Sequence, residues 1–111
     1  MFNHQRLNCY CKALELAKRT PSIVNRWPQG YGYLTDQLKR AISSVVLNIA
    51  EGNGRTSPKE RKRFFTISIG SINEVAAIID IASALRLIRS EEYAYIQDQL
   101  LQVLKMTYKL S

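Results

Sequence analysis

Apolar residues recur at helical spacing through most of the chain, and the clearest stripe predicts a helix over residues 34–51. Positions three, four, seven or eight apart share one face of an α-helix, so such a stripe marks the buried side. Its members are Leu34, Leu38, Ala41, Ile42, Val45 and Ile49. The run Glu51-Gly52-Asn53-Gly54 then predicts a stop, because glycine is favoured just beyond a helix C-terminus.

A second long pattern predicts a helix over residues 58–88. Ser57 suits the N-cap, Pro58 suits the first helical position, and Glu60 completes a capping box. Two neighbouring apolar stripes cover about half of the circumference, more than the ~100° that a surface helix needs. One stripe comprises Phe64, Ile67, Ser71, Val75, Ile78, Ala82 and Leu85, and the other comprises Phe65, Ile69, Ile72, Ala76 and Ile79.

The excess apolar width of this helix has two explanations. A subunit interface would bury the surplus against other copies of the chain, and we assign Phe65, Ile69, Ile72 and Ala76 to that interface. Alternatively, the helix is central and is buried by its neighbours within one chain. We favour the oligomer.

Two weaker patterns flank these helices. Residues 5–25 are expected to be helical, with Pro21 interrupting the helix or ending its regular part. The aromatic segment 26–33 is expected to fold over one end of the core, with its Trp and Tyr rings as a cap. A last helix is predicted over residues 91–110. No alternating strand pattern competes, so the sequence predicts one all-α domain, an up-down-up-down four-helix bundle over residues 1–111.

The composition fits a small domain with a strongly basic surface. The chain has 111 residues, 46% of them apolar, and its 16 Lys and Arg against 9 Asp and Glu give a net charge of +7. No run approaches the ~20 apolar residues of a membrane span, and no signal core follows the N-terminus, so we expect a cytoplasmic protein with no membrane partner. The charge suits RNA or DNA, although a merely soluble basic surface has the same composition.

Groups suited to catalysis or metal binding are sparse. Cys9 and Cys11 would point about 200° apart on a helix, away from a shared disulfide or metal. His4 is the only histidine, and the acidic residues are scattered. Residues 52–55 lack the trailing Lys-Ser/Thr of a nucleotide-binding loop. The sequence therefore predicts no enzyme, no metal site and no cofactor.

A basic cluster is the remaining candidate for function. Lys59, Lys62 and Arg63 fall within an arc of about 100° that faces away from the apolar stripe, and Arg55 precedes them in the turn. The free N–H groups of a helix N-terminus also attract anions. Lys39 and Arg40 on the preceding helix extend the patch. We predict contacts to the phosphate backbone of RNA or DNA at these positions, and the alternative is an ordinary solvated face.

Several segments of the chain resemble the family of 23S rRNA intervening-sequence proteins, and the string Asn48-Ile49-Ala50-Glu51-Gly52 followed by Gly54-Arg55 is the most specific. The others are Tyr31-Gly32-Tyr33-Leu34, Gln37-Leu38-Lys39-Arg40-Ala41, Lys59-Glu60, Phe64-Phe65, Gly70-Ser71 and Glu74. The resemblance spans residues 7–110, with a departure at Asn8-Cys9-Tyr10-Cys11, where family members often carry Trp. It implies a four-helix bundle assembled as a ring-like homopentamer. A related branch serves diversity-generating retroelements as an accessory factor that binds nucleic acid and a reverse transcriptase.

Two functions follow from these expectations. The first is a non-enzymatic, basic, oligomeric module that binds RNA or DNA through backbone phosphates. The second is a protein-interaction scaffold, for example an accessory factor for a reverse transcriptase, in which the basic face meets carboxylates.

Overall fold

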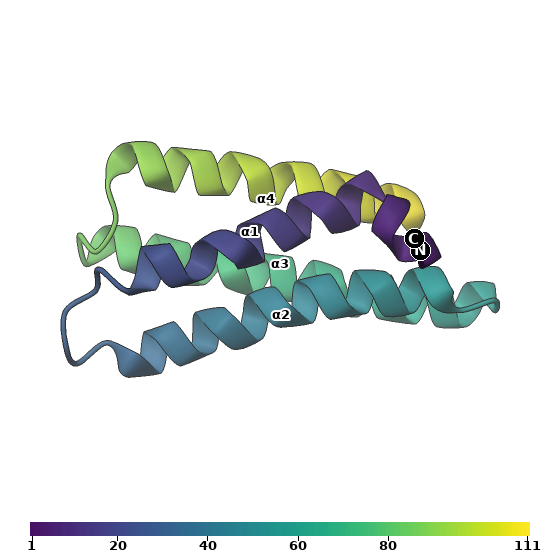
Figure 1. Cartoon of the computed structure of the whole chain (residues 1–111), viewed down its shortest axis with the longest axis horizontal. Coiled ribbons are helices and arrows are strands. Elements are labelled where there is room, and N and C mark those ends of the chain that lie inside the picture. Colours follow the sequence, from purple (N-terminus) through teal and green to yellow (C-terminus); the bar gives the residue numbers. More distant parts are fainter.

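The computed structural model describes residues 1–111 and contains four α-helices and no strand, which confirms the all-α class. The helices are α1 (Asn8–Val24), α2 (Gly32–Gly54), α3 (Pro58–Ala84) and α4 (Ser90–Leu110), and a short 3-10 helix, η1 (Asn3–Arg6), precedes them. Successive helices run antiparallel, and each packs against two others in an elongated bundle of 44 × 24 × 24 Å (Figure 1). Both termini lie at the end of the bundle that carries the turn between α2 and α3 (Figure 1).

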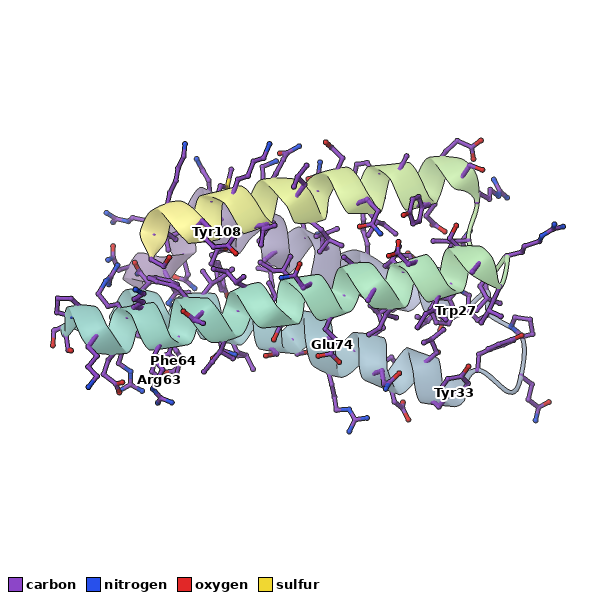
Figure 2. All side chains as sticks on the ribbon, turned by 180° about the vertical axis from the view of Figure 1, so that it is seen from behind. Trp27, Tyr33, Arg63, Phe64, Glu74 and Tyr108 are labelled. Carbon is purple, nitrogen blue, oxygen red and sulfur yellow. The ribbon has the colours of Figure 1, made fainter.

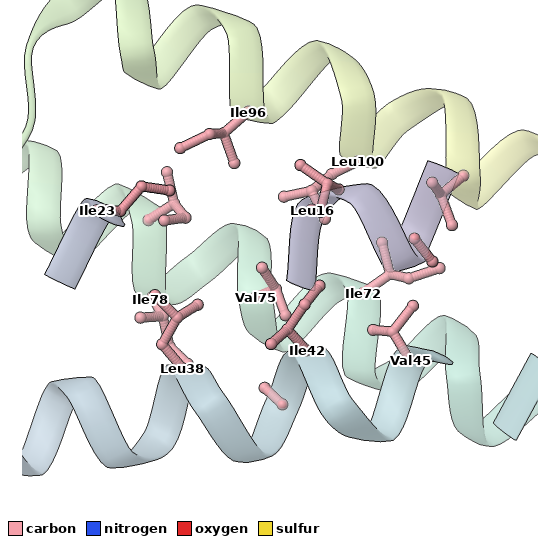
Figure 3. Close-up of a cluster of buried hydrophobic side chains, with 14 of the residues drawn as sticks. Leu16, Ile23, Leu38, Ile42, Val45, Ile72, Val75, Ile78, Ile96 and Leu100 are labelled. Carbon is pink, nitrogen blue, oxygen red and sulfur yellow. The ribbon is translucent and has the colours of Figure 1, made fainter. Parts of the chain in front are cut away.

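The core fills the space between all four helices (Figure 3). The predicted stripe of α2 is confirmed, because each of its six members is at most 3% exposed. Helix α1 contributes Leu16 and Ile23, and α4 contributes Ile96 and Leu100, which meet the α2 and α3 side chains in Figure 3. The apolar pattern of each helix is therefore accounted for chiefly by burial within one chain.

The buried side of α3 lies between the two stripes predicted for it. Its buried residues are Ser68, which belongs to neither stripe, and seven members of the two stripes: Phe65, Ser71, Ile72, Val75, Ile78, Ile79 and Ala82. The outer members, such as Phe64 and Ile69, are only half-buried, and Ile67 and Leu85 are exposed. Because α2 and α4 flank α3 on both sides, the helix buries a wider face than a helix with one neighbour would.

The predicted subunit interface needs a correction at two of its four residues. Phe65 and Ile72 are 0% and 2% exposed within the single chain, so they have no side-chain surface to offer another copy. Ile69 and Ala76 are half-buried and keep some free surface, and Ala76 lines a shallow groove with Leu101 and Leu104 of α4. The reason is the position of α3 in the bundle, where the second stripe turns toward the core and α4.

The glycines at the end of α2 do not stop the helix where the sequence predicts. The helix continues through Gly52 to Gly54, and Arg55 is its C-cap. Gly52 is buried, and a Cβ built on it would lie 2.7 Å from Cε1 of Phe65. A separation of that size is a clash, so Gly52 lets the buried ring of Phe65 approach the backbone of α2.

Helix α3 ends at Ala84, four residues before the predicted end. Arg86 adopts a left-handed backbone conformation with φ of 60°. The N–H of Leu87 then donates to the carbonyl of Ala82 at 2.8 Å, a bond that closes a Schellman-type cap. The apolar residues Leu87 and Ile88 extended the sequence pattern past this cap, because they pack on the core from the loop.

Two predictions about the first helix and the loop after it also change. Pro21 neither interrupts nor ends α1, which continues to Val24. Trp27 is buried and Tyr31 is half-buried against the core, as expected for a cap. Tyr33 is not part of that cap, because it lies in the first turn of α2 and is 60% exposed.

Helix α3 is also long and apolar enough, by length and composition alone, to cross a membrane. Its most apolar window has a mean hydropathy of 1.5 and is 33% buried in the bundle. Core helices of soluble bundles meet the same criterion, so this property is weak evidence for a membrane span. It does show that α3 keeps apolar surface outside the core.

Candidate nucleic-acid interface

The turn between α2 and α3 places the predicted basic cluster at one end of the bundle. Ser57 is the N-cap of α3, where its Oγ accepts a hydrogen bond from the Glu60 N–H at 3.4 Å, and Pro58 occupies the first turn. The second half of the predicted capping box does not form, because the Glu60 carboxylate pairs with Arg63 instead. The predicted N-cap and first-turn proline of α3 are therefore confirmed, but the Glu60 carboxylate pairs with Arg63 and not with the N-cap backbone.

Arg61 lies outside the set of basic residues predicted to bind phosphates, and it joins the two helices. Its Nη1 donates to the carbonyl of Asn53 at 3.0 Å and to that of Arg55 at 3.3 Å. Carbonyls at a helix C-terminus have no partner within the helix, and a nearby guanidinium can satisfy them. Arg61 therefore acts as a clamp on the turn. In the sequence, the only indication of this role is the position of Arg61 shortly after the end of α2.

Arg55 and Arg63 are both neutralised by neighbouring acids. Arg55 pairs with Glu51 at 2.9 Å, and Arg63 pairs with Glu60 at 3.0 Å. All four side chains are about half exposed, where such pairs contribute little stability and exchange readily. The net positive charge of the cluster therefore comes from other residues.

Phe64 lies between these two arginines and was assigned to the buried stripe by the sequence analysis. Its ring is half-buried, and the Cζ atoms of Arg55 and Arg63 lie 4.9 and 4.6 Å from its centroid. Both distances are within the ~6 Å of a cation–π interaction. Figure 2 shows Phe64 and Arg63 close together near the start of α3. The structure thus adds an aromatic ring to a site that the sequence described as purely basic.

Four of the six predicted cations have no partner within the chain. Lys59 and Lys62 near the start of α3, and Lys39 and Arg40 on α2, are exposed and take part in no ion pair or side-chain hydrogen bond. The other two are Arg55 and Arg63. The structure therefore separates free positive charges from paired ones, which the sequence could not do.

Two shallow grooves lie beside Arg40, one along α2 and one between α2 and α3. One is lined by Lys39, Arg40, Ser43, Ser44, Leu47 and Asn48, and the other by Gln37, Arg40, Ala41, Ser44, Ser71 and Glu74. Midway along the two helices, the hydroxyl group of Ser44 on α2 is hydrogen-bonded to that of Ser71 on α3 at 2.7 Å. At a rise of 1.5 Å per residue, Arg40 and Arg55 are about 22 Å apart along α2. We call the side of the molecule that carries these two grooves, together with the basic cluster at its end, the α2–α3 surface.

The core between the four helices leaves almost no empty space. The most enclosed cavity has a volume of about 10 Å³, is lined mainly by Leu16, Ile42 and other core residues, and has room for about one water. Burial raises the pKa of the Cys9 thiol, although a hydrogen bond with Thr107 acts in the opposite direction. The hydrogen bond to Asp80 raises the pKa of the Tyr93 hydroxyl. Both groups hold helices together away from the α2–α3 surface.

The fold and this surface define a small, basic four-helix bundle that carries free cations on the adjacent helices α2 and α3, in addition to those elsewhere on its surface. The chain belongs to the family of 23S rRNA-intervening sequence proteins, whose sequence pattern it matches over residues 5–109. That match covers all four helices except the last residue of α4, and it confirms the predicted family. No curated protein sequence matches the chain.

Proposed function

We propose that the chain is a non-enzymatic module that binds RNA or DNA through backbone phosphates on the α2–α3 surface. The observation that carries this proposal is the presence of four exposed cations without a partner, Lys39, Arg40, Lys59 and Lys62. A free ammonium or guanidinium group can neutralise a phosphate without first breaking an ion pair. The family name, which refers to an rRNA gene segment, is compatible with such a role.

We further propose that the module works as a homo-oligomer, a ring-like pentamer as the family resemblance implies. An apolar area on α4 beside α3 supports this, because Leu101 and Tyr108 are 48% and 58% exposed. A shallow groove between these helices is lined by Asn73, Ala76, Leu101, Leu104 and other residues. Several copies of one weak phosphate-binding surface would raise the affinity for a long polyanion through avidity.

Neutralisation of the free cations tests the phosphate contacts. A variant with Lys39, Arg40, Lys59 and Lys62 changed to Gln should bind RNA and DNA much more weakly than the wild type. Each phosphate contact contributes about 0.7 to 0.9 to the slope of log Kd against log salt concentration, so the slope should fall by about 3 for each bound protomer. Fluorescence anisotropy at several salt concentrations measures both quantities.

The control for this experiment carries the same charge change elsewhere. Lys18, Arg89, Lys105 and Lys109 lie on α1, just before α4 and on α4, and are exposed. Their replacement by Gln should leave most of the salt dependence in place. Equal losses in the two variants would refute a defined binding surface, and the absence of salt-dependent binding by the wild type would refute nucleic-acid binding as a whole.

The exposed apolar area also supports a second candidate function, a scaffold for another protein such as a reverse transcriptase. In that case, acidic side chains of the partner would meet the α2–α3 surface. Affinity capture from the native host after nuclease treatment separates the two functions. A protein partner that is retained without nucleic acid favours the scaffold, and loss of all partners on nuclease treatment favours the nucleic-acid module.

A further inference from the structure

The packing of the core does not explain why Phe64 carries an aromatic ring at the rim of the bundle. The neighbouring Phe65 already fills the core position beside Gly52, where it is fully buried. Phe64 instead presents its ring at the rim, with the guanidinium groups of Arg55 and Arg63 over it. Three flat groups of the kind that stack with nucleobases thus gather in the middle of the basic cluster.

We propose that Phe64, Arg55 and Arg63 form a stacking platform for unpaired bases, so that the α2–α3 surface binds single-stranded nucleic acid in preference to duplex. This inference rests on the proposed function and specifies its ligand. Unpaired bases stack on aromatic rings and on arginine planes, and every base offers a flat face, so this contact is independent of sequence. Bases inside a duplex are already stacked, and only their phosphates reach a convex helical surface.

The charges around the platform divide the binding between two kinds of contact. Arg55 and Arg63 are held by Glu51 and Glu60 in half-exposed ion pairs, which a phosphate can replace at little cost. Lys59 and Lys62 have no partner to give up and lie within two turns of Phe64 along α3. Arg55 and Arg63 can therefore contact the phosphates next to the stacked base, and the lysines, which face away from Phe64 around α3, contact phosphates further along the strand.

The space beside the platform suits an extended strand. A shallow groove lies along Arg55 and is lined also by His4, Leu47, Ala50, Glu51 and Gly54. It joins the platform to the face of η1 and the end of α2, and it is open to solvent. A nucleotide next to the stacked base would enter this groove, where Arg55 can contact both that nucleotide and the stacked base.

A comparison of strands tests the platform directly. Wild type and Phe64→Leu are titrated by fluorescence anisotropy with an unstructured 20-nucleotide RNA, the same sequence as DNA, and the blunt RNA duplex of that sequence. We expect the wild type to bind both single strands at least about tenfold more tightly than the duplex. Phe64→Leu should lose about tenfold in affinity for the single strands and change less than twofold for the duplex.

The control variant removes an aromatic ring from another face. Tyr95 lies on α4, is 39% exposed and has the Cζ atom of Arg19 4.4 Å from its ring centroid, so Tyr95→Leu removes a comparable ring without touching the platform. It should bind all three ligands as the wild type does. Circular dichroism and thermal unfolding show whether each variant keeps the fold, and leucine retains most of the apolar contact of Phe64 with the bundle.

A second measurement reports stacking without relying on affinity. Phe64→Trp places an indole on the platform, and stacking of a base quenches its emission. Trp27 is buried at the opposite end of the bundle, so the wild-type emission is the baseline (Figure 2). The single-stranded RNA should quench the variant and leave the wild type unchanged.

The possible outcomes separate this inference from the proposed function. Equal binding of single strands and duplex by the wild type, or equal losses for both in Phe64→Leu, would overturn the stacking platform and leave the phosphate-binding module intact. The absence of quenching in a Phe64→Trp variant that binds single strands would overturn it as well. Failure of the wild type to bind any of the three ligands would overturn both proposals.

Discussion

Phe64 and Phe65 are adjacent in sequence and have opposite environments. Phe65 is fully buried against the backbone of α2, whereas Phe64 lies at the rim under two arginines. The difference depends on Gly52, because its missing Cβ provides the space that the ring of Phe65 occupies. Gly52 on α2 thus permits the close packing of the ring that the register of α3 turns toward the core.

Substitution of Gly52 tests this dependence. In Gly52→Ala, the new Cβ would lie 2.7 Å from the Phe65 ring, so the ring or the helix must shift. We expect a loss of about 1–3 kcal/mol in the free energy of unfolding, typical of overpacking in a core, measured by urea denaturation.

Gly70 supplies the matched control for that measurement. It also lies inside a helix, but a Cβ added there meets no atom within 4 Å. Gly70→Ala should therefore stabilise the protein by about 0.5–1 kcal/mol through the better helix propensity of alanine. A Gly52→Ala variant as stable as the wild type would show that the close approach to Phe65 carries no constraint.

At the scale of the elements, the junction of α2 and α3 is the best-defined unit of the candidate site. Ser57 starts α3, and Arg61 reaches back to two carbonyls at the end of α2. The helix ends are therefore connected by a side chain as well as by the three-residue turn. The positions of the platform and of the free lysines depend on that connection.

Removal of the Arg61 clamp should weaken the junction. Arg61→Ala loses two hydrogen bonds from a charged donor and its contact with the ring of Phe65, and we expect the free energy of unfolding to fall by about 1–2 kcal/mol. Lys62→Ala, one position further on, removes a cation without a partner and should change stability by less than about 0.5 kcal/mol. Equal effects of the two substitutions in urea denaturation would argue against a structural role for Arg61.

The sequence predicted the elements better than their ends. The four helices, their order and the start of α3 at Ser57 and Pro58 were correct, because periodicity and capping are local properties. The ends of α2 and α3 were misplaced because Gly52 serves a contact with a distant ring, and because Leu87 and Ile88 pack on the core from a loop. Both errors arise from contacts between elements.

At the scale of the whole molecule, the apolar area on α3 and α4 lies beside the α2–α3 surface. Leu101 and Tyr108 are about half exposed on α4, and the half-buried Ala76 of α3 lines a shallow groove together with Leu101. An area of this kind on a small bundle favours contact with another protein surface. We place the proposed interface between copies there, and not at Phe65 and Ile72.

Charge introduced into this area should break the proposed oligomer. Leu101→Glu places a carboxylate in the interface, and we expect a shift from the oligomer toward the 12.7 kDa monomer in sedimentation velocity. Leu47→Glu is the control, because Leu47 is 63% exposed on the α2 side of the molecule. Dissociation by Leu47→Glu but not by Leu101→Glu would move the interface to α2, and a monomeric wild type would refute the oligomer.

The sequence by itself determined the all-α class, the four helices, the family and the region of excess positive charge, because these depend on local periodicity and composition. Only the tertiary structure decided which cations are free, which ring of the Phe64-Phe65 pair is buried, and which part of α3 remains exposed. The physical reason is that ion pairing, close packing and burial are pairwise properties of residues brought together by folding. The α2–α3 surface therefore contains the predicted cations, but their division into paired and free groups follows from the packing of the two helices.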